Sequence, residues 1–490
     1  MRYPAAHTLF TVVLSLLLSF YTNQSRASSC LSNVVTISGR VEGASEKDTL
    51  SIEFKKEFVY GSIGAEMQYS SCDNEGYFSF TFKIDHIAMV SLFINNGNSI
   101  IFYRYIEPGD CINCFITQSQ NNYTVKYSGQ GSTKFNCMAA LEQKRTEINE
   151  KTYSKVPPGL FSNDSLLNAL AAAFCQLDET ADELFVVLQA YKNKISSEMM
   201  NVLTADIIGE AGRDKCFLIP YFLQKADTKQ RMNIKRLFIN RAYLKTGNLA
   251  GSAVYSDNYI EFLYRRCQQQ LALKNEKGNS MNELYELLSK QYAGFIRDRV
   301  LTSYLLREHA GTDNNEYQSC LQKAINTTTT ALFKNYLVKQ FERTSTGVPA
   351  FDFLLPGIDG KLVSLNELKG KIVFVDFWFT GCSACKELAK SLENIVIPNF
   401  NDSEVVFVSI CLDKNKAQWL SSLKKGGYSS EKSINLFTDG SAFDHPLVKH
   451  YNIQGCPALL LIDKKSKIIS VNPPREPIDL IKEINKALKL

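Results

Sequence analysis

The chain has 490 residues, of which 45% are hydrophobic and 21% are charged. This composition supports packed cores in about two to four domains and excludes an intrinsically disordered chain. The formal net charge of +5 is small for this length, and acidic and basic residues are interspersed. Because no basic stripe occurs, nucleic acid is not an expected partner.

Residues 1–27 are expected to be a signal peptide. Arg2 supplies a positive charge, residues 9–20 are nearly all apolar, and residues 25–27 form a small-x-small cleavage pattern. The apolar run is shorter than the roughly 20 residues of a membrane-spanning helix. The alternative is a lipoprotein acylated at Cys30, although no Leu lies three residues before it. No later segment is apolar for long enough to span a membrane, so we expect a periplasmic or cell-envelope protein without a transmembrane helix in the mature chain.

The strand and turn signals of residues 34–130 predict a small antiparallel β-sandwich. The expected strands are 35–41, 77–82, 89–94 and 100–105. Each shows either an alternation of apolar and polar residues or a cluster of β-forming residues. Turn residues occupy 73–76 and 108–110. This part of the chain is therefore expected to be a separate β domain.

Residues 131–342 are expected to form a helical region. Apolar residues recur at three- and four-residue spacing from Leu166 to Leu177, and similar periods run through 180–192, 259–273 and 281–295. No convincing fixed-period repeat occurs. Small polar residues from Arg343 to Pro349 then predict a linker.

Residues 347–490 alternate strand and helix patterns, which indicates an α/β fold. The expected strands are 371–378, 405–410 and 457–462, and the expected helices are 385–394 and 478–488. The predicted fold class is therefore multidomain: a β-sandwich, then an α-helical region, then a C-terminal α/β domain.

Thirteen cysteines occur, so at least one is unpaired within the chain. Most lie in apolar stretches, such as Phe174-Cys175, and are expected to be small buried side chains. Only five His occur, none at zinc-ligand spacing from a Cys, so no metal site is expected. Cys111 and Cys114 form a CxxC pair that no helical pattern follows; on a strand they would point to opposite faces, and a catalytic role is not expected.

A second CxxC pair, Cys382 and Cys385, lies between a strand pattern and a helix pattern. At such a junction Cys382 would lie at a helix N-terminus, where backbone N–H groups and the helix dipole stabilise a thiolate. Cys385, one turn later, would face the first sulfur and resolve a mixed disulfide. The placement, more than the spacing, predicts redox chemistry.

Residues 375–386 (Val-Asp-Phe-Trp-Phe-Thr-Gly-Cys-Ser-Ala-Cys-Lys) resemble the active-site segment of thioredoxins, and residues 451–462 resemble their cis-proline segment. Residues 349–371 resemble the entry hairpin of the TlpA/ResA branch, as do Leu412-Asp413 and Trp419. The resemblance covers 347–490. The β-sandwich and helices ahead of it resemble, more loosely, the exported TlpA-type reductases of Bacteroidetes.

The resemblance implies a thioredoxin-like thiol–disulfide oxidoreductase without a cofactor. Cys382 would be the nucleophile and Cys385 the resolving thiol, so the two would form a redox disulfide. Asp376 would be a buried acid with a raised pKa that moves protons. Pro457 would be cis, and Trp378 would pack beneath the motif.

Three departures from thioredoxins concern residues beside the site. Gly381 stands where thioredoxins usually have Trp, and Ser383-Ala384 replaces Gly-Pro. Cys456 precedes Pro457, where the family usually has Ile, Val or Thr. Cys456 is expected to be a small apolar contact; the alternative is a third redox thiol that forms some Cys382–Cys456 disulfide.

The leading functional hypothesis is reduction of disulfides in envelope proteins. The resemblance implies a membrane electron donor of the DsbD/CcdA type and substrates that include apocytochromes c. One alternative is an envelope binding or docking protein whose redox domain is regulatory. Another is a peroxiredoxin-like peroxidase, but its Pro-x-x-x-Thr-x-x-Cys pattern would need Pro and Thr where Val375 and Phe379 stand.

Overall fold

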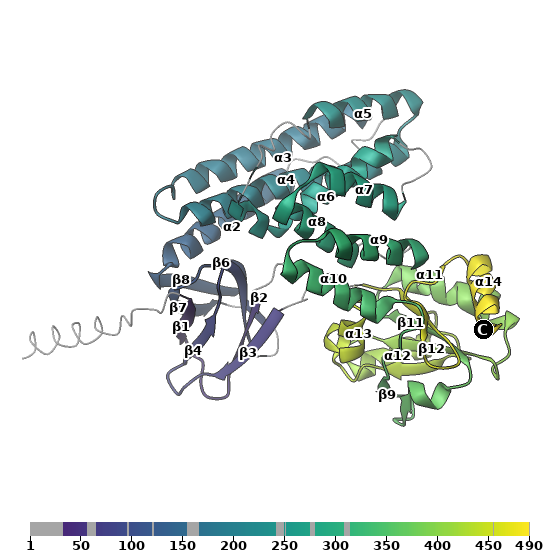
Figure 1. Cartoon of the computed structure of the whole chain (residues 1–490). Coiled ribbons are helices and arrows are strands. Elements are labelled where there is room, and N and C mark those ends of the chain that lie inside the picture. The colour runs from purple at the N-terminus through teal and green to yellow at the C-terminus, as the bar shows by residue number, and fades with distance from the viewer. Residues whose placement is uncertain are drawn as a thin grey trace, which may run out of the picture. The chain divides into compact units, whose positions relative to one another are not determined.

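The computed structural model describes residues 33–55, 65–95, 98–119, 122–153, 166–241, 249, 251–274, 280–307, 314–453 and 455–489. These residues belong to two compact units, which are described separately (Figure 1). The first contains the described residues up to Tyr153 together with Glu179–Thr204. The second contains Leu166–Asp178 and the described residues from Ala205 onward. The predicted signal peptide and Cys30 lie outside the described residues.

Two four-stranded sheets form the sandwich of the first unit, in the orders β4-β1-β7-β8 and β3-β2-β5-β6. The strands are β1 (Val34–Val41), β2 (Thr49–Lys55), β3 (Ala65–Ser71), β4 (Tyr77–Lys83), β5 (Ala88–Ile94), β6 (Asn98–Ile106), β7 (Cys111–Ser119) and β8 (Asn122–Gln130). Alternate residues of β4 are buried, as the sequence pattern predicts. Phe54 of one sheet stacks on Phe82 of the other, with ring centroids 4.3 Å apart. The first sheet is mixed, because β1 pairs with β7 in parallel.

Helices follow the sandwich. They are α2 (Ser132–Tyr153), α3 (Leu166–Gln189), α4 (Ser197–Lys225), α5 (Thr228–Arg241), α6 (Asp257–Lys274), α7 (Met281–Gln291), α8 (Gly294–Arg307), α9 (Asn314–Thr327) and α10 (Ala331–Thr344). The helical period that runs through 281–295 covers two helices, because α7 ends before an extended Tyr292. Gly294, with a φ of +56°, then begins α8 at a backbone conformation that favours glycine.

The segment predicted as a linker, residues 343–349, is hydrogen-bonded along its length. Gly347 N–H donates to the Ile468 carbonyl at 2.7 Å, and Ile468 N–H donates to the Val348 carbonyl at 2.9 Å. These bonds join the segment to β15 (Ile468–Ser470). The domain boundaries at 34–130, 131–342 and 347–490 stay predictions.

A five-stranded sheet in the order β13-β12-β11-β14-β15 forms the centre of the C-terminal domain. Its other strands are β11 (Ile372–Trp378), β12 (Val405–Cys411), β13 (Ile434–Phe437) and β14 (Ala458–Ile462), preceded by the short pair β9 (Leu354–Pro356) and β10 (Leu362–Ser364). β11 is parallel to β12 and antiparallel to β14. The helices are α11 (Ser383–Ser391), α12 (Lys416–Lys425), α13 (Pro446–His450) and α14 (Pro477–Leu488). The predicted fold class is confirmed.

The two faces of the central strand β11 pack against different elements. Ile372 and Phe374 belong to a core with residues of α11 and α14. Val373 and Val375 belong to a second core with residues of α13. Because side chains alternate along a strand, Asp376 and Trp378 share the α11 face with Ile372 and Phe374. This register places an acid beneath the helix that begins at the CxxC pair.

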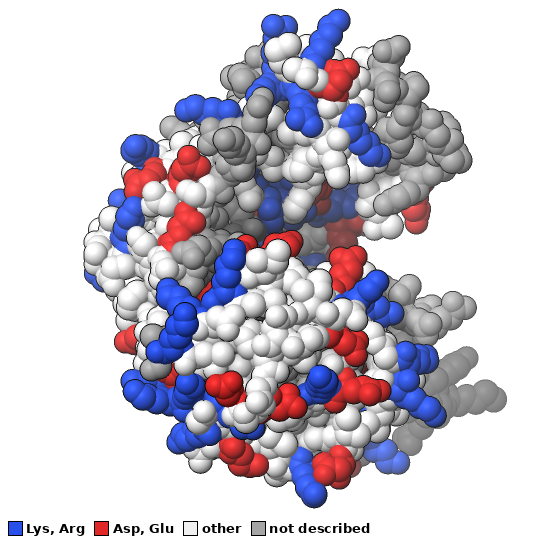
Figure 2. Space-filling view, turned by 90° about the vertical axis from the view of Figure 1, so that its right-hand side faces the viewer, with Lys and Arg blue, Asp and Glu red and all other residues white. Residues whose placement is uncertain are grey.

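On the face shown in Figure 2, Lys and Arg side chains are mixed with Asp and Glu side chains, and no continuous stripe of one sign crosses it. Among the described residues, no helix has both the length and the apolar character that crossing a membrane requires.

Candidate active site around the Cys382–Cys385 disulfide

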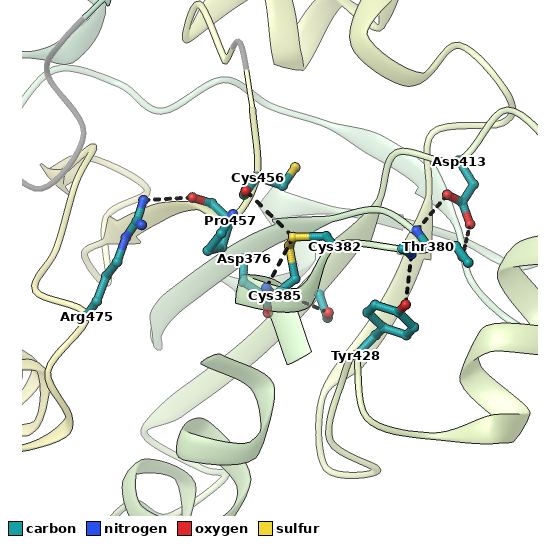
Figure 3. The surroundings of a disulfide bond; sticks show 11 residues. Asp376, Thr380, Cys382, Cys385, Asp413, Tyr428, Cys456, Pro457 and Arg475 are labelled. Atoms are coloured by element: carbon teal, nitrogen blue, oxygen red, sulfur yellow. Dashed lines mark hydrogen bonds between the residues drawn. A yellow bond between two sulfur atoms is a disulfide. The ribbon is translucent and has the colours of Figure 1, made fainter. Parts of the chain in front are cut away.

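The sulfurs of Cys382 and Cys385 are joined in a disulfide with an S–S distance of 2.06 Å (Figure 3). Cys382 is the N-cap residue of α11, and its Sγ lies 3.1 Å from the backbone nitrogen of Cys385. The sulfur of Cys382 therefore lies where the helix N-terminus is most positive, as the sequence predicts. In general, a helix N-terminus stabilises a cysteine thiolate.

The exposed residues next to Cys382 in the chain are small. Cys382 is 8% exposed and Cys385 is 3% exposed, so Cys382 is the more accessible of the two. Gly381, Ser383 and Ala384 are all exposed. None of these three positions therefore places a bulky side chain over the disulfide.

The loop before Cys382 is held by two side chains that come later in the chain. Thr380 N–H donates to Asp413 Oδ1 at 2.9 Å, and the Thr380 hydroxyl donates to Asp413 Oδ2 at 2.5 Å. Gly381 N–H donates to the Tyr428 hydroxyl at 2.8 Å. Gly381 has a φ of +102°, which side chains with a Cβ rarely adopt. A Trp at this position, where thioredoxins usually have one, would therefore be strained in this backbone conformation.

Stacked aromatic rings pack beside the disulfide. Trp378 and Tyr428 stack with ring centroids 4.8 Å apart, and Trp419 and Phe437 stack at 5.0 Å. Both tryptophans are fully buried, and they belong to one hydrophobic cluster with the two cysteines. Trp378 thus lies where the resemblance implies, as a packing residue. No sequence pattern marks Tyr428 as a site residue, because only the fold brings it to the CxxC loop.

Asp376 is buried on β11, behind the disulfide in the view of Figure 3. Burial raises the pKa of its carboxyl to about 7, against the opposing effect of a hydrogen bond. That bond comes from the Ser409 hydroxyl, which donates to Asp376 Oδ2 at 3.0 Å. A carboxyl with this pKa can both accept and release a proton near neutral pH.

The peptide bond between Cys456 and Pro457 is cis. The carbonyl oxygen of Cys456 lies 3.6 Å from the Sγ of Cys382, and Figure 3 shows that this oxygen, not the Cys456 thiol, faces the disulfide. Burial, followed by the charge of Asp376, raises the pKa of the Cys456 thiol to about 12. A guanidinium nitrogen of Arg475, a residue that no sequence pattern marks, donates to the Pro457 carbonyl at 2.8 Å.

The other CxxC pair is not a disulfide between its own members, because Cys114 is a free thiol. Burial raises the pKa of Cys114 to about 12, which makes the thiolate scarce. Most of the remaining described cysteines are buried, as predicted, but Cys175 is exposed. It follows the fully buried Phe174 on α3 and points away from the core that Phe174 enters.

A profile of the family described as thioredoxin-like matches residues 370–468, which contain the disulfide, the buried acid and the cis-proline. The C-terminal domain is thioredoxin-like. The thiol-disulfide oxidoreductase ResA of Bacillus thuringiensis subsp. konkukian (strain 97-27) is 26% identical over 138 residues, which is 28% of this chain and 75% of the relative. ResA of Bacillus subtilis (strain 168) is 29% identical over 130 residues, which is 26% of this chain and 68% of the relative.

A solved structure, a thiol:disulfide interchange protein from Bacteroides sp., is 27% identical, with a TM-score of 0.26, and the match covers 30% of this chain and 93% of that chain. The sequence relatives confirm the resemblance to the TlpA/ResA branch and identify a thiol–disulfide oxidoreductase domain. Each of these matches covers less than a third of the chain, so none of them assigns a function to the sandwich.

Proposed function

We propose that this chain is an exported enzyme that reduces disulfides in cell-envelope proteins through Cys382 and Cys385. The observation that carries the proposal is a disulfide whose first sulfur caps a helix and contacts a cis-proline loop. The buried acid Asp376 beneath the same helix completes the arrangement.

The first step is attack by Cys382 of the reduced protein. Its thiolate, stabilised at the N-terminus of α11, forms a bond to one sulfur of the substrate disulfide. The substrate S–S bond breaks, and the second substrate sulfur leaves as a thiolate that takes up a proton. The product is a mixed disulfide between Cys382 and the substrate.

The second step is resolution by Cys385. Its thiol loses a proton, and the resulting thiolate attacks the sulfur of Cys382 and releases the substrate as a thiol. Asp376 in its ionised form accepts that proton, because a pKa of about 7 leaves much of it ionised at neutral pH. The substrate gains two electrons and the chain returns to its disulfide form.

The disulfide form must be reduced again before the next cycle. In an oxidising compartment no small-molecule thiol pool does this, so we propose a membrane electron donor of the DsbD/CcdA type. The substrates then include envelope proteins with disulfides, among them apocytochromes c. Export depends on the predicted signal peptide, which lies outside the described residues.

Cysteine-to-serine variants of the full chain test the proposal. In a dithiothreitol-driven insulin assay, Cys382→Ser should lose at least about 100-fold in activity, because the attacking thiolate is gone. Cys385→Ser should accumulate stable mixed disulfides with its partners when expressed in its native envelope, which identifies the substrate class. Cys175→Ser, at an exposed position, is the matched control. Full activity of Cys382→Ser would overturn the proposal.

We further propose that Cys456 serves as a small packing residue beside the disulfide. Its raised pKa and the direction of its thiol in Figure 3 support this role. Mass spectrometry of the protein across redox conditions should then find no Cys382–Cys456 disulfide. A detectable fraction of that disulfide would instead make Cys456 a third redox thiol.

A further inference from the structure

A cleft of about 220 Å³ lies beside the cis-proline loop. Its lining includes Arg307 at the end of α8, Cys456 and Pro457 of the loop, and Val471, Asn472 and Arg475 of the segment between β15 and α14. Asn452 joins the loop to α8, because its side-chain amide donates to the Leu306 carbonyl at 2.8 Å. A buried hydrogen bond therefore joins two of the segments that form the walls of the cleft, α8 and the cis-proline loop.

The charged residues that line this cleft are both basic. Its lining contains Arg307 and Arg475 but no Asp or Glu. Arg307 forms an ion pair with Glu261 at 2.8 Å. The Arg475 side chain is exposed, and partial desolvation lowers its pKa; no carboxylate of the described residues forms an ion pair with it. Its hydrogen bond to the Pro457 carbonyl uses one of the five N–H donors of a guanidinium.

An exposed guanidinium at the edge of a cleft can turn its free N–H donors toward a bound anion. A carboxylate fits the planar fork of donors that a guanidinium presents. The remaining donors of Arg475 and the absence of acidic side chains in the lining thus favour a ligand that carries a carboxylate.

The cleft is close to the reacting sulfur. The Sγ of Cys382 lies 3.6 Å from the Cys456 carbonyl, and the next carbonyl, that of Pro457, accepts from Arg475 at 2.8 Å. Standard bond lengths along this path place the guanidinium no more than about 13 Å from the sulfur. An extended peptide covers that distance in about four residues.

We propose that this cleft binds a carboxylate of the substrate polypeptide, carried within about four residues of the cysteine that Cys382 attacks, and that Arg475 holds it. The inference rests on the proposed function and adds a preference for acidic residues near the substrate disulfide. Arg475 is thus a specificity-determining residue of the reaction.

Peptides with one activated cysteine test this preference. Each peptide carries its cysteine as a mixed disulfide with pyridine-2-thiol, and carries either Glu or Gln at one of the four positions on either side. The pre-reduced full chain attacks the peptide sulfur, the bond to the pyridine sulfur breaks, and pyridine-2-thione leaves with one proton. Cys385 then releases the peptide thiol, so the chain gives up two electrons. The release of thione gives the rate constant.

The readout is the ratio of rate constants for the Glu and Gln peptides, in which any effect common to both peptides cancels. At one or more positions the wild-type chain should prefer Glu by about two- to fivefold, the range of an exposed ion pair. The preference should fall in 0.5 M NaCl, because salt screens it. It should disappear in Arg475→Gln and persist in part in Arg475→Lys. Lys482→Gln, at an exposed side chain outside the cleft, is the control with the same change of charge and should keep it.

A wild-type ratio near one at every position would overturn the inference, even where Arg475→Gln does not fold. A ratio that survives in a folded Arg475→Gln would also overturn it. The uncharged mixed disulfide of pyridine-2-thiol with 2-mercaptoethanol separates this result from failure of the proposed function. If the wild-type chain reacts with this compound no faster than Cys382→Ser does, both proposals fail. If the wild-type chain reacts faster and its Glu-to-Gln ratio is still near one, only the carboxylate preference fails.

Discussion

Replacement of Asp376 by Asn should stabilise the C-terminal domain at high pH and leave its stability nearly unchanged at low pH. Asn has the shape of a protonated Asp and can still accept the hydrogen bond from Ser409. Unlike Asp, it never places a charge in the buried position on β11. The variant therefore isolates the cost of ionising this carboxyl.

The magnitude follows from the difference between the folded and unfolded pKa. Burial raises the pKa of Asp376 from 3.8 to about 7. Between these values the folded domain holds a proton that the unfolded chain has lost, so the free energy of unfolding falls as pH rises. Each pKa unit corresponds to about 1.4 kcal/mol. The wild-type domain should therefore lose about 4 kcal/mol between pH 4 and pH 8 through this residue, and Asp376→Asn should not.

Tryptophan fluorescence makes the measurement specific to this domain in the full chain. The chain has two tryptophans, and both Trp378 and Trp419 are fully buried near the disulfide. In guanidinium chloride, about 4 kcal/mol corresponds to a midpoint shift of roughly 1 M at pH 8. At pH 4 the two midpoints should nearly coincide.

Asp439→Asn is the matched control, because it makes the same change of side chain at an exposed position. A stability difference between wild type and Asp376→Asn that is the same at pH 4 and pH 8 would refute the assignment of a raised pKa. A difference that grows toward low pH would show that the carboxylate is stabilised and not penalised by its surroundings.

Three further variants test the contacts of the site by the same fluorescence measurement. Ser409→Ala removes the hydrogen bond that lowers the pKa of Asp376, so the decline of stability should extend to pH values above 7; a decline confined to lower pH would contradict this. Gly381→Ala puts a Cβ at a φ of +102° and should cost about 1–3 kcal/mol, whereas Gly357→Ala, at a glycine without a positive φ, should cost less; equal costs would show that backbone strain is not the reason. Tyr428→Phe keeps the ring but loses the acceptor of Gly381 N–H and should cost about 1 kcal/mol; no change would mean that water replaces the hydroxyl.

Local patterns were sufficient for much of the fold. The alternation in β4 and the apolar run of β11 are properties of neighbouring residues, and the structure has strands at both. Local periodicity failed at 281–295, because the helical spacing continues across Tyr292 and Gly294 while the backbone does not. A few backbone angles interrupt a helix without changing its apolar pattern.

The chemistry of the site was predictable where it depends on chain order. The position of Cys382 before a helix follows from a strand pattern, two cysteines and a helix pattern in succession, and the structure makes Cys382 the N-cap. Its thiol chemistry needs only that local arrangement. The raised pKa of Asp376 was expected from resemblance alone, because burial is a property of the packed sheet and not of the residue.

Contacts between distant segments required the tertiary structure. Ser409 reaches Asp376 across 33 residues of chain, and Tyr428 reaches Gly381 across 47. Arg475 lies 18 residues after Pro457 and has no sequence pattern that marks it. A hydrogen bond depends on the relative positions of two elements, and those positions result from the packing of the whole domain. For this reason the residues proposed to carry the reaction were recognisable in the sequence, while those proposed to tune and select it emerged only once the chain was folded.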